Sequence, residues 1–556
     1  MAELSRRRFT LAGLGAAGLG IAATDLVVGG GVAAAAPVPD AGADQSWPFL
    51  TQGFGPVSVA PGDRRYPDLL LRGYNRRFTG NPDAVKLVGS TSQVVQAVNE
   101  AVAAGKRVTV RGGGHCLENF VDDPDVRVVI DLSEMRAVYF DTTMNAFAVE
   151  GGAILSQVYR TLDLGWGVTI PGGSCPSVGV GGHITGGGYG VLSRLYGLVA
   201  DNLYAVEVVV VDAFGMARSV IATSSANDPN RDLWWAHAGG GGGNFGIVTR
   251  FWLRSPGATG TDPTKLLPPT PGGIMITTLF WDWSQLDEAA FTTLVTNFGT
   301  WHEQNSAPGA AANQLWASLI AIRQGKGGVI VRAQVDPTVT GTQQMLTDFA
   351  AAMTRNVAAA PAASTTGNLP WLYTTTTSAS EVAGVFGIPS LLLRSKTKGA
   401  YHKKGYTPDQ LRTVYRYLTS PSYTYASGLM GLFSFGGKVN SFSPTTTAVP
   451  HRDSVMLASF SNYWSDAADE TRQLQWVREL YRDVYATTGG VPVPNGVTDG
   501  NYVNWPDVDL ADPAWNTSSA PWSTIYYKDN YARLQQIKAA RDPRDIFHHA
   551  LSVRPH

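Results

Sequence analysis

The sequence has few charged residues, almost no cysteine and no repeated segment. Of its 556 residues, two are Cys and 16% are Asp, Glu, Lys or Arg, with a formal net charge of −1. A charge so close to zero argues against nucleic acid or another polyanion as a partner. Heptads and long charge runs are also absent, whereas Gly and Trp are plentiful. This composition favours two or three domains with large cores, which suits an enzyme.

Long hydrophobic runs are missing too, except near the N-terminus. There Arg6-Arg7-Arg8-Phe9 precedes an apolar run rich in Ala and Gly, and Ala34-Ala35-Ala36 offers a small-residue cleavage site. The segment resembles a twin-arginine signal over residues 1–36, with an ordinary signal peptide or a membrane anchor as the alternative. We therefore expect a periplasmic or extracellular protein without stable membrane association after processing. A G-x-G-x-x-G match at 13–18 lies in this segment and is not a dinucleotide fingerprint.

The two cysteines lie in two glycine-rich stretches. One runs from Pro171 to Gly190 around Cys175, and the other runs from Arg111 to Cys116 and contains His115. Glycine lets the backbone approach a ligand closely, so we interpret both stretches as binding one flat or charged cofactor. A disulfide between the cysteines is not expected, because both lie in segments typical of ligand binding.

His115 and Cys175 are the candidate attachment points for a flavin. Histidine and cysteine are the nucleophilic side chains that can bond to an isoalloxazine ring. For His115 the alternatives are a polar loop residue or a metal ligand, but no His/Cys/carboxylate cluster of zinc spacing accompanies it, so no metal site is expected. For Cys175 the alternative is a small apolar residue packed in the core.

A strand, a helix and a second strand lead into the first glycine-rich stretch. The strands are predicted at 84–88 and 108–110, and the helix at 92–104 with Ser92 as its N-cap. The loop that follows has amides free to bind an anion. The other predicted elements of this half are strands at 126–132, 146–150 and 247–253, a helix at 155–162, and a hairpin of 203–211 with 217–222.

A third run of glycines, Gly239–Val248, contains another G-x-G-x-x-G at 241–246. A Rossmann fingerprint follows a strand and opens a helix, whereas this one runs into a predicted strand. We interpret it as a further close approach of backbone to the same cofactor and not as a nicotinamide dinucleotide site.

Composition changes at a linker rich in Pro, Gly and Thr, residues 256–273. The residues that follow, 274–495, are predicted to form an α+β domain with an antiparallel sheet and helices on one face. The tail, 496–556, is expected to fold back on the first domain and close the active site. Within it, 501–507 is predicted as a short strand and turn, and 531–540 as a helix.

Taken together and in this order, the Arg111–His115 loop, the Cys175 loop, the Gly239–Val248 run and the Tyr502-Val503-Asn504 motif resemble the berberine bridge enzyme-like group of the vanillyl-alcohol oxidase/PCMH flavoproteins. The similarity is greatest to its bacterial exported oxidases of sugars and of glycosylated or polyketide antibiotics, and it covers almost the whole mature chain. It implies an α+β protein with a PCMH-type FAD-binding domain at 37–256. That domain has two α/β subdomains, is completed by the tail, and is joined to an antiparallel substrate domain covered by helices.

The resemblance implies FAD bound covalently, with His115 on the 8α-methyl group and Cys175 on C6 of the flavin. The pyrophosphate is expected on the amides of the 111–116 loop. The implied partners are a small-molecule alcohol and dioxygen, which is reduced to hydrogen peroxide. The further cofactor-binding residues implied are Arg111, Gly112, Gly113, Gly114, Cys116, Gly179, Gly181, Gly182, His183, Gly243, Asn244, Gly246, Ile247, Val248, Tyr502 and Asn504.

The same resemblance implies Tyr502 as the base that removes the hydroxyl proton while hydride passes to flavin N5. A free phenol has a pKa of about 10, so Tyr502 needs a positive or hydrogen-bonding neighbour, which the sequence does not identify. The alternative for Tyr502 is a buried aromatic with one hydrogen bond. Tyr189 is expected near the flavin ring, either contacting substrate as a second catalytic residue or simply stacking.

The sequence departs from the family pattern in three places. Trp505 replaces the tyrosine that often ends the tail motif, and the strand at 432–437 has no polar residue or tyrosine in the expected place, so Tyr423 or Tyr425 is a weak substitute. Cys116 follows the attached histidine where serine is common, and it should point away from the flavin if the segment alternates like a strand.

Two other functions stay open at this stage. One keeps the flavin but performs oxidative ring closure or dehydrogenation of a secondary metabolite with another acceptor. The other is a secreted protein that retains flavin without turnover, against which Tyr502 argues. Sugar and antibiotic substrates are not separated by the sequence, although the Trp-rich second domain favours a bulky substrate with apolar parts. Oligomeric state is likewise left open.

Overall fold

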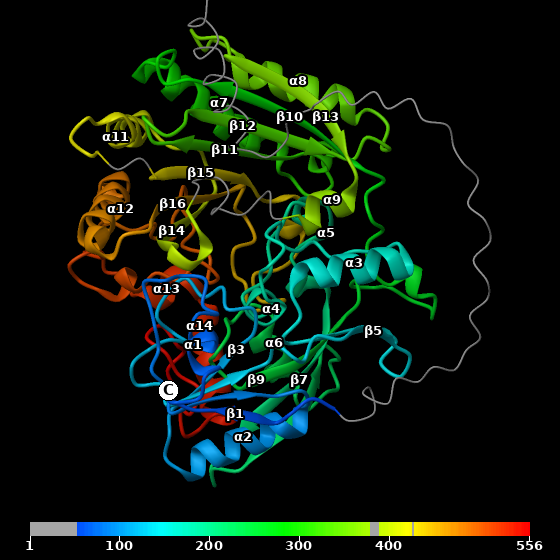
Figure 1. The fold of residues 1–556 in the computed structure, drawn as a ribbon. Helices are drawn as coiled ribbons and strands as arrows, with labels where there is room; N and C mark the ends of the chain where they lie inside the picture. Colours follow the sequence, from blue (N-terminus) through cyan, green and yellow to red (C-terminus); the bar gives the residue numbers. More distant parts are fainter. Residues whose placement is uncertain (1–52, 378–387, 425–426) are drawn as a thin grey trace, which may run out of the picture.

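The computed structural model describes residues 53–377, 388–424 and 427–556. The expected signal peptide and Tyr425 lie outside these residues. Three sheets make up the molecule: two belong to the half at the bottom of Figure 1, and a seven-stranded sheet forms the half at the top. This confirms the predicted α+β class with two α/β subdomains and an antiparallel second domain.

The smallest sheet carries the first glycine-rich loop. Its order is β1-β2-β4-β3, with β2 and β3 parallel to the central β4 and β1 antiparallel to β2. The strands are β1 (Val57–Val59), β2 (Ala84–Leu87), β3 (Val108–Arg111) and β4 (Val128–Asp131). Because β3 ends at Arg111, the residues after it leave the sheet and their amides are free for a ligand.

Helix α2 (Thr91–Ala103) joins β2 to β3 and buries Val94 and Val98. The predicted N-cap, Ser92, is wrong: Ser90 has the extended backbone of an N-cap, and its hydroxyl accepts the N–H of Gln93. The helix therefore begins one residue earlier than predicted. Both serines are residue types that suit an N-cap, and only the extended backbone at Ser90 decides between them.

The second sheet is antiparallel throughout, in the order β5-β6-β9-β7-β8. The predicted hairpin is confirmed as β7 and β8. Helix α3 runs four residues beyond its predicted end, because the first residue that stops it is Gly167 in the left-handed conformation, with φ of 65°. The elements are β5 (Val138–Asp141), β6 (Ala146–Glu150), β7 (Leu203–Val211), β8 (Ala217–Thr223), β9 (Ile247–Leu253), α3 (Leu155–Trp166), α4 (Val180–Thr185) and α6 (Arg231–His237).

The seven-stranded sheet is the predicted antiparallel domain, in the order β13-β10-β12-β11-β15-β16-β14. Its strands are β10 (Ile274–Trp281), β11 (Trp316–Ile322), β12 (Val329–Val335), β13 (Ala363–Leu369), β14 (Arg394–His402), β15 (Leu429–Ser434) and β16 (Met456–Trp464). Its covering helices are α7 (Glu288–Asn305), α8 (Thr342–Thr354), α11 (Pro408–Thr419) and α12 (Glu470–Val484). In Figure 1, α7 and α8 lie on one side of this sheet, and its other side faces the half that contains the two smaller sheets.

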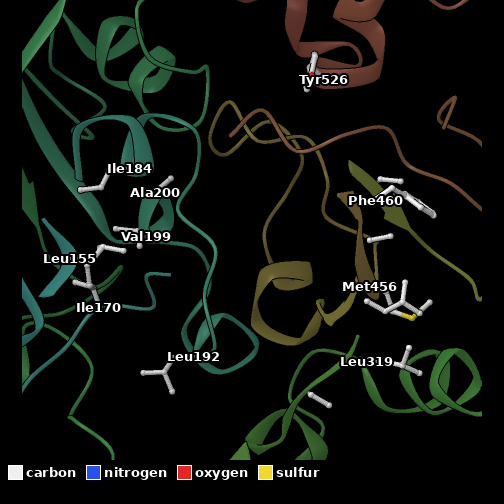
Figure 2. Packing of buried hydrophobic residues seen from close by; sticks show 14 of the residues in the cluster. Leu155, Ile170, Ile184, Leu192, Val199, Ala200, Leu319, Met456, Phe460 and Tyr526 are labelled. Atoms are coloured by element: carbon white, nitrogen blue, oxygen red, sulfur yellow. The ribbon is translucent and has the colours of Figure 1, made fainter. Parts of the chain in front are cut away.

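One hydrophobic core joins the two halves. The same cluster contains Leu155 and Ile184 from the first half and Leu319 and Phe460 from the second. Figure 2 shows the first pair at the left and the second pair at the right. The halves are therefore fixed to one another by burial of apolar surface. No helix in the described ranges is long and apolar enough to cross a bilayer.

The C-terminal tail packs on the first half, as expected. Its helices are α13 (Trp522–Tyr527) and α14 (Asn530–Arg541). Lys538 Nζ donates to Asn244 O at 2.7 Å, and Val553 N donates to Asn244 Oδ1 at 2.8 Å. These bonds tie the tail to the third glycine run.

The strand expected at 501–507 is wrong. Strand-like pairing occurs just before it, where Asp499 N donates to Tyr401 O and Tyr401 N donates to Gly500 O. Gly500 then has φ of 90°, which turns the chain out of the sheet. The following residues form a turn closed by Trp505 N on Tyr502 O at 2.8 Å.

Candidate active site

A cavity of about 660 Å³ lies between the two glycine-rich loops, the open face of the seven-stranded sheet and the tail. Its described lining contains no Asp, Glu or Lys, and Arg111 is the one arginine among its lining residues. Most of a flavin dinucleotide is uncharged and its pyrophosphate is anionic, so a wall without carboxylates suits it. Apart from Arg111, the titratable side chains of the described lining are phenols, imidazoles and thiols.

The His115 and Cys175 loops are packed backbone to backbone. A Cβ on Gly113 would lie 2.4 Å from Gly179 N, and a Cβ on Gly179 would lie 2.3 Å from Gly113 N. Neither position accepts a larger residue without moving the other loop. This contact brings the two candidate nucleophiles together: Ser177 Oγ is 3.0 Å from His115 Nε2 and 3.7 Å from Cys175 Sγ.

His115 is held as a neutral imidazole. Its ring stacks on Tyr74 with centroids 4.6 Å apart, and burial lowers its pKa to about 4. A neutral ring keeps a nitrogen lone pair for bond formation. With Nε2 facing Ser177, Nδ1 is the nitrogen left for that bond.

The two cysteines differ in their surroundings. Burial raises the pKa of the Cys116 thiol to about 12, and its Sγ donates to Glu118 O at 3.2 Å. Cys116 is therefore held as an inert thiol. Cys116 lines the cavity, as the resemblance implied for a cofactor-binding residue, while its thiol is held on Glu118 O. The structure holds Cys116 and Cys175 as separate thiols.

Bare backbone forms much of the wall, which is what close contact with a cofactor requires. A Cβ on Gly182 would meet no atom within 4 Å, so the space before it is open. From the third run, Gly243 also lines the cavity, with φ of 74°, a conformation that favours glycine. The two candidate attachment residues, the loop amides and the acid-free wall together fit FAD.

Nearly all residues predicted to bind cofactor line this one cavity. They are Arg111, Gly112, Gly113, Gly114, His115, Cys116, Cys175, Gly179, Gly181, Gly182, His183, Gly243, Asn244, Gly246, Val248, Tyr502 and Asn504, and Tyr189 joins them. Ile247 does not line it. Its side chain packs with Val209 and Val211 in the core, because neighbouring residues of strand β9 face opposite sides.

The side chains of three of these residues bond to other protein groups. The Arg111 guanidinium pairs with buried Asp131 at 2.9 Å. His183 Nε2 accepts the N–H of Gly173 at 3.0 Å, and Asn244 Nδ2 donates to Gly240 O at 3.0 Å. They hold the three glycine-rich segments in place.

Tyr502 has the hydrogen-bonding neighbours that the sequence did not identify. Its phenolic oxygen accepts Asn504 Nδ2 at 3.0 Å and the backbone N–H of Tyr189 at 3.2 Å, and the N–H of Gly188 also faces it. Burial raises the pKa of Tyr502 above that of a free phenol, while these three donors lower it. Donors aimed at an oxygen favour its ionised form, which is the form a base needs.

The Tyr189 hydroxyl already makes two hydrogen bonds. It donates to Ser434 O at 2.6 Å and accepts Trp316 Nε1 at 2.8 Å, and burial raises its pKa well above that of a free phenol. Tyr189 therefore acts on Tyr502 through its backbone N–H and fixes the end of β15. Tyr423, the proposed substitute, lies outside the cavity wall, stacked on Trp476 and bonded to Gln473.

Sequence reasoning missed four residues of the cavity wall, Tyr74, Trp316, Phe433 and Trp505. It also missed Ser177, which contacts His115 and Cys175. Ser177 follows Cys175 by two positions, so a search for hydroxyls beside the candidate nucleophile could have found it. Trp316 and Phe433 reach the site from distant strands, and no local pattern marks them.

Comparison with known proteins agrees with this geometry. A family model described as an FAD binding domain matches residues 82–214, and one described as berberine and berberine like matches residues 501–554. The chain is 51% identical to the aclacinomycin-N/aclacinomycin-A oxidase of Streptomyces galilaeus, over 100% of this chain and 99% of that protein. It is 29% identical to the hexose oxidase of Chondrus crispus, over 91% of this chain and 97% of that protein.

Solved structures show the same similarity. The structure of a glycopeptide hexose oxidase complexed with teicoplanin matches with a TM-score of 0.86 and 48% identity, over 91% of this chain and 100% of that one. Full-length identity of this degree, two matched family models and a shared fold lead to one conclusion: the chain belongs to the berberine bridge enzyme-like family of FAD-dependent oxidoreductases.

Proposed function

We propose that the protein oxidises a hydroxyl or hemiacetal group on the sugar of a glycoside with a bulky apolar aglycone, using FAD attached through both His115 and Cys175. The observation that carries this proposal is the convergence of His115 and Cys175 on Ser177, in a cavity without carboxylates where Tyr502 accepts three N–H donors. The names of the relatives support it, since they include an aclacinomycin oxidase, a hexose oxidase and a glycopeptide hexose oxidase.

Tyr502 removes the proton of the substrate hydroxyl in this proposal. Asn504 and the N–H of Tyr189 hold the phenolic oxygen and stabilise its negative charge before it accepts the proton. When bound, FAD supplies the acceptor for the carbinol hydride, and its reoxidation by dioxygen yields hydrogen peroxide. The side chains of Trp316 and Phe433 exclude water from the same cavity.

The attachment is tested by the colour of denatured protein. We expect wild type to keep its yellow colour after acid precipitation, because a covalent bond survives unfolding. His115→Ala and Cys175→Ala should each keep one bond and stay coloured, whereas the double variant should release flavin completely. Cys116→Ala is the matched control and should stay coloured, because its thiol is turned onto Glu118 O. Loss of all colour from wild type would contradict attachment.

The role of Asn504 is tested by the pH dependence of turnover. Activity should rise with pH as the fraction of Tyr502 phenolate rises, because its pKa lies above that of a free phenol. Asn504→Ala removes a donor that lowers this pKa, so the profile should move to higher pH, with about a 10-fold loss at neutral pH that shrinks as pH increases. A loss of equal size at every pH would indicate a positioning effect only. The measurement is kcat/KM against pH, with flavin absorbance as the check on folding.

A further inference from the structure

The open face of the seven-stranded sheet presents an apolar surface to the cavity. We call it the shelf and define it as six cavity-lining side chains on three neighbouring strands: Trp316, Ile320 and Ile322 of β11, Ile330 of β12, and Leu429 and Phe433 of β15. Phe433 packs on Trp505 of the tail with centroids 6.0 Å apart, which marks one side of the shelf. The other side is β12, two strands away.

Polar side chains begin where the shelf ends on β12. Arg332 follows Ile330 by two residues and so lies on the same sheet face, about 7 Å further along the strand. Its partners in register are Ser318 on β11 and Thr278 on β10, and Gln334 follows on the same face. Ser318 itself lies between Trp316 and Ile320 of the shelf. A charged group with polar neighbours therefore borders an otherwise apolar surface.

The Arg332 guanidinium has no charge partner among the described residues. It is half-buried, and burial alone lowers its pKa, with no carboxylate or hydrogen-bond acceptor acting on it. Two fully buried arginines of this chain have partners: Arg452 pairs with Asp201 at 2.7 Å, and Arg194 donates to Phe435 O at 2.7 Å. Removing a guanidinium from water without a partner is unfavourable, so a ligand that supplies the partner gains binding energy.

We propose that Arg332, with Ser318 and Thr278 beside it, binds a carboxylate or ionised phenol on the aglycone of the substrate. The apolar rings of the aglycone would lie on the shelf and its acidic group would reach β12, on the side away from Trp505. This inference rests on the proposed function for the orientation of the sugar toward Tyr502. Binding of apolar rings that end in an anionic oxygen depends only on the shelf and on Arg332.

The test is direct binding of aromatic acids of increasing length to the flavin-loaded enzyme. Benzoate, biphenyl-4-carboxylate and terphenyl-4-carboxylate are each compared with their methyl esters by titration calorimetry. At least one acid should bind wild type about 10- to 100-fold more tightly than its ester. Arg332→Gln should abolish that preference, Arg332→Lys should keep part of it, and Arg218→Gln, on the exposed edge of β8, should leave it unchanged.

If no acid in the series shows a preference that depends on Arg332, the proposal is overturned. Failure of the proposed function is detected separately, by hydrogen peroxide release from glycosides with neutral aglycones. Arg332→Gln should oxidise those as well as wild type does. Absence of oxidation in both proteins would reject the proposed reaction while leaving the binding measurement decisive for Arg332.

Discussion

Tyr502→Phe should retain its flavin and lose about 10²- to 10⁴-fold in kcat, the range expected when a general base is removed. The substitution takes away one hydroxyl and leaves the ring, which packs with Tyr401 and Trp505. The cavity offers no Asp, Glu or Lys to take over the proton among its described lining residues. Tyr189 is a poor replacement, because its own hydroxyl is bonded to Ser434 O and Trp316 Nε1.

The measurement is the rate at which substrate bleaches flavin absorbance without oxygen, which isolates the reductive step. Tyr401→Phe is the matched control. Tyr401 is buried in the same cluster, and its hydroxyl has no hydrogen-bond partner among the described residues. It should reduce flavin at close to the wild-type rate. A Tyr502→Phe enzyme with wild-type bleaching would assign the proton transfer to another group.

Lys396→Met should destabilise the folded protein by about 3–5 kcal/mol, because it leaves the buried Glu118 carboxylate without its counter-charge and takes one of two lysines from Asp507. Lys396 Nζ contacts Glu118 Oε1 and lies 2.7 Å from Asp507 Oδ1, and the three side chains are 1%, 3% and 0% exposed. Burial would lower the pKa of Lys396, but Asp507 and Glu118 raise it above its ordinary value. The ion pairs join strand β14, the loop after His115 and the tail after Tyr502.

The loss of stability is measured as the decrease in the urea midpoint followed by flavin fluorescence. Lys265→Met is the control: its ion pair with Asp262 is 3.5 Å long, and its side chain is 77% exposed, so the change should be below about 1 kcal/mol. The double variant Lys396→Met/Glu118→Gln also removes the unpaired charge of Glu118 and should recover part of the lost stability. Equal midpoints for Lys396→Met and wild type would show that these buried ion pairs contribute nothing to stability.

Much of the fold follows from patterns that are local in the sequence. Strand β9 has the predicted limits, and the predicted hairpin forms as β7 and β8, because alternation and turn residues act over a few positions. The helix ends were less well predicted. Ser90 and Ser92 both suit an N-cap, and the choice depends on which residue has extended backbone in the folded chain.

By itself the sequence determined the fold class, the family and the three glycine-rich segments, because glycine, histidine and cysteine in fixed order carry that chemistry locally. Only the tertiary structure decided what surrounds them. It placed Ser177 between His115 and Cys175, and it set Asn504 and the N–H of Tyr189, 313 positions away, on the Tyr502 oxygen. The contacts of Ser177 with His115 and of Tyr189 with Tyr502 join segments far apart in the chain. They arise when burial of a shared core brings the segments together, and no local pattern of residues records them.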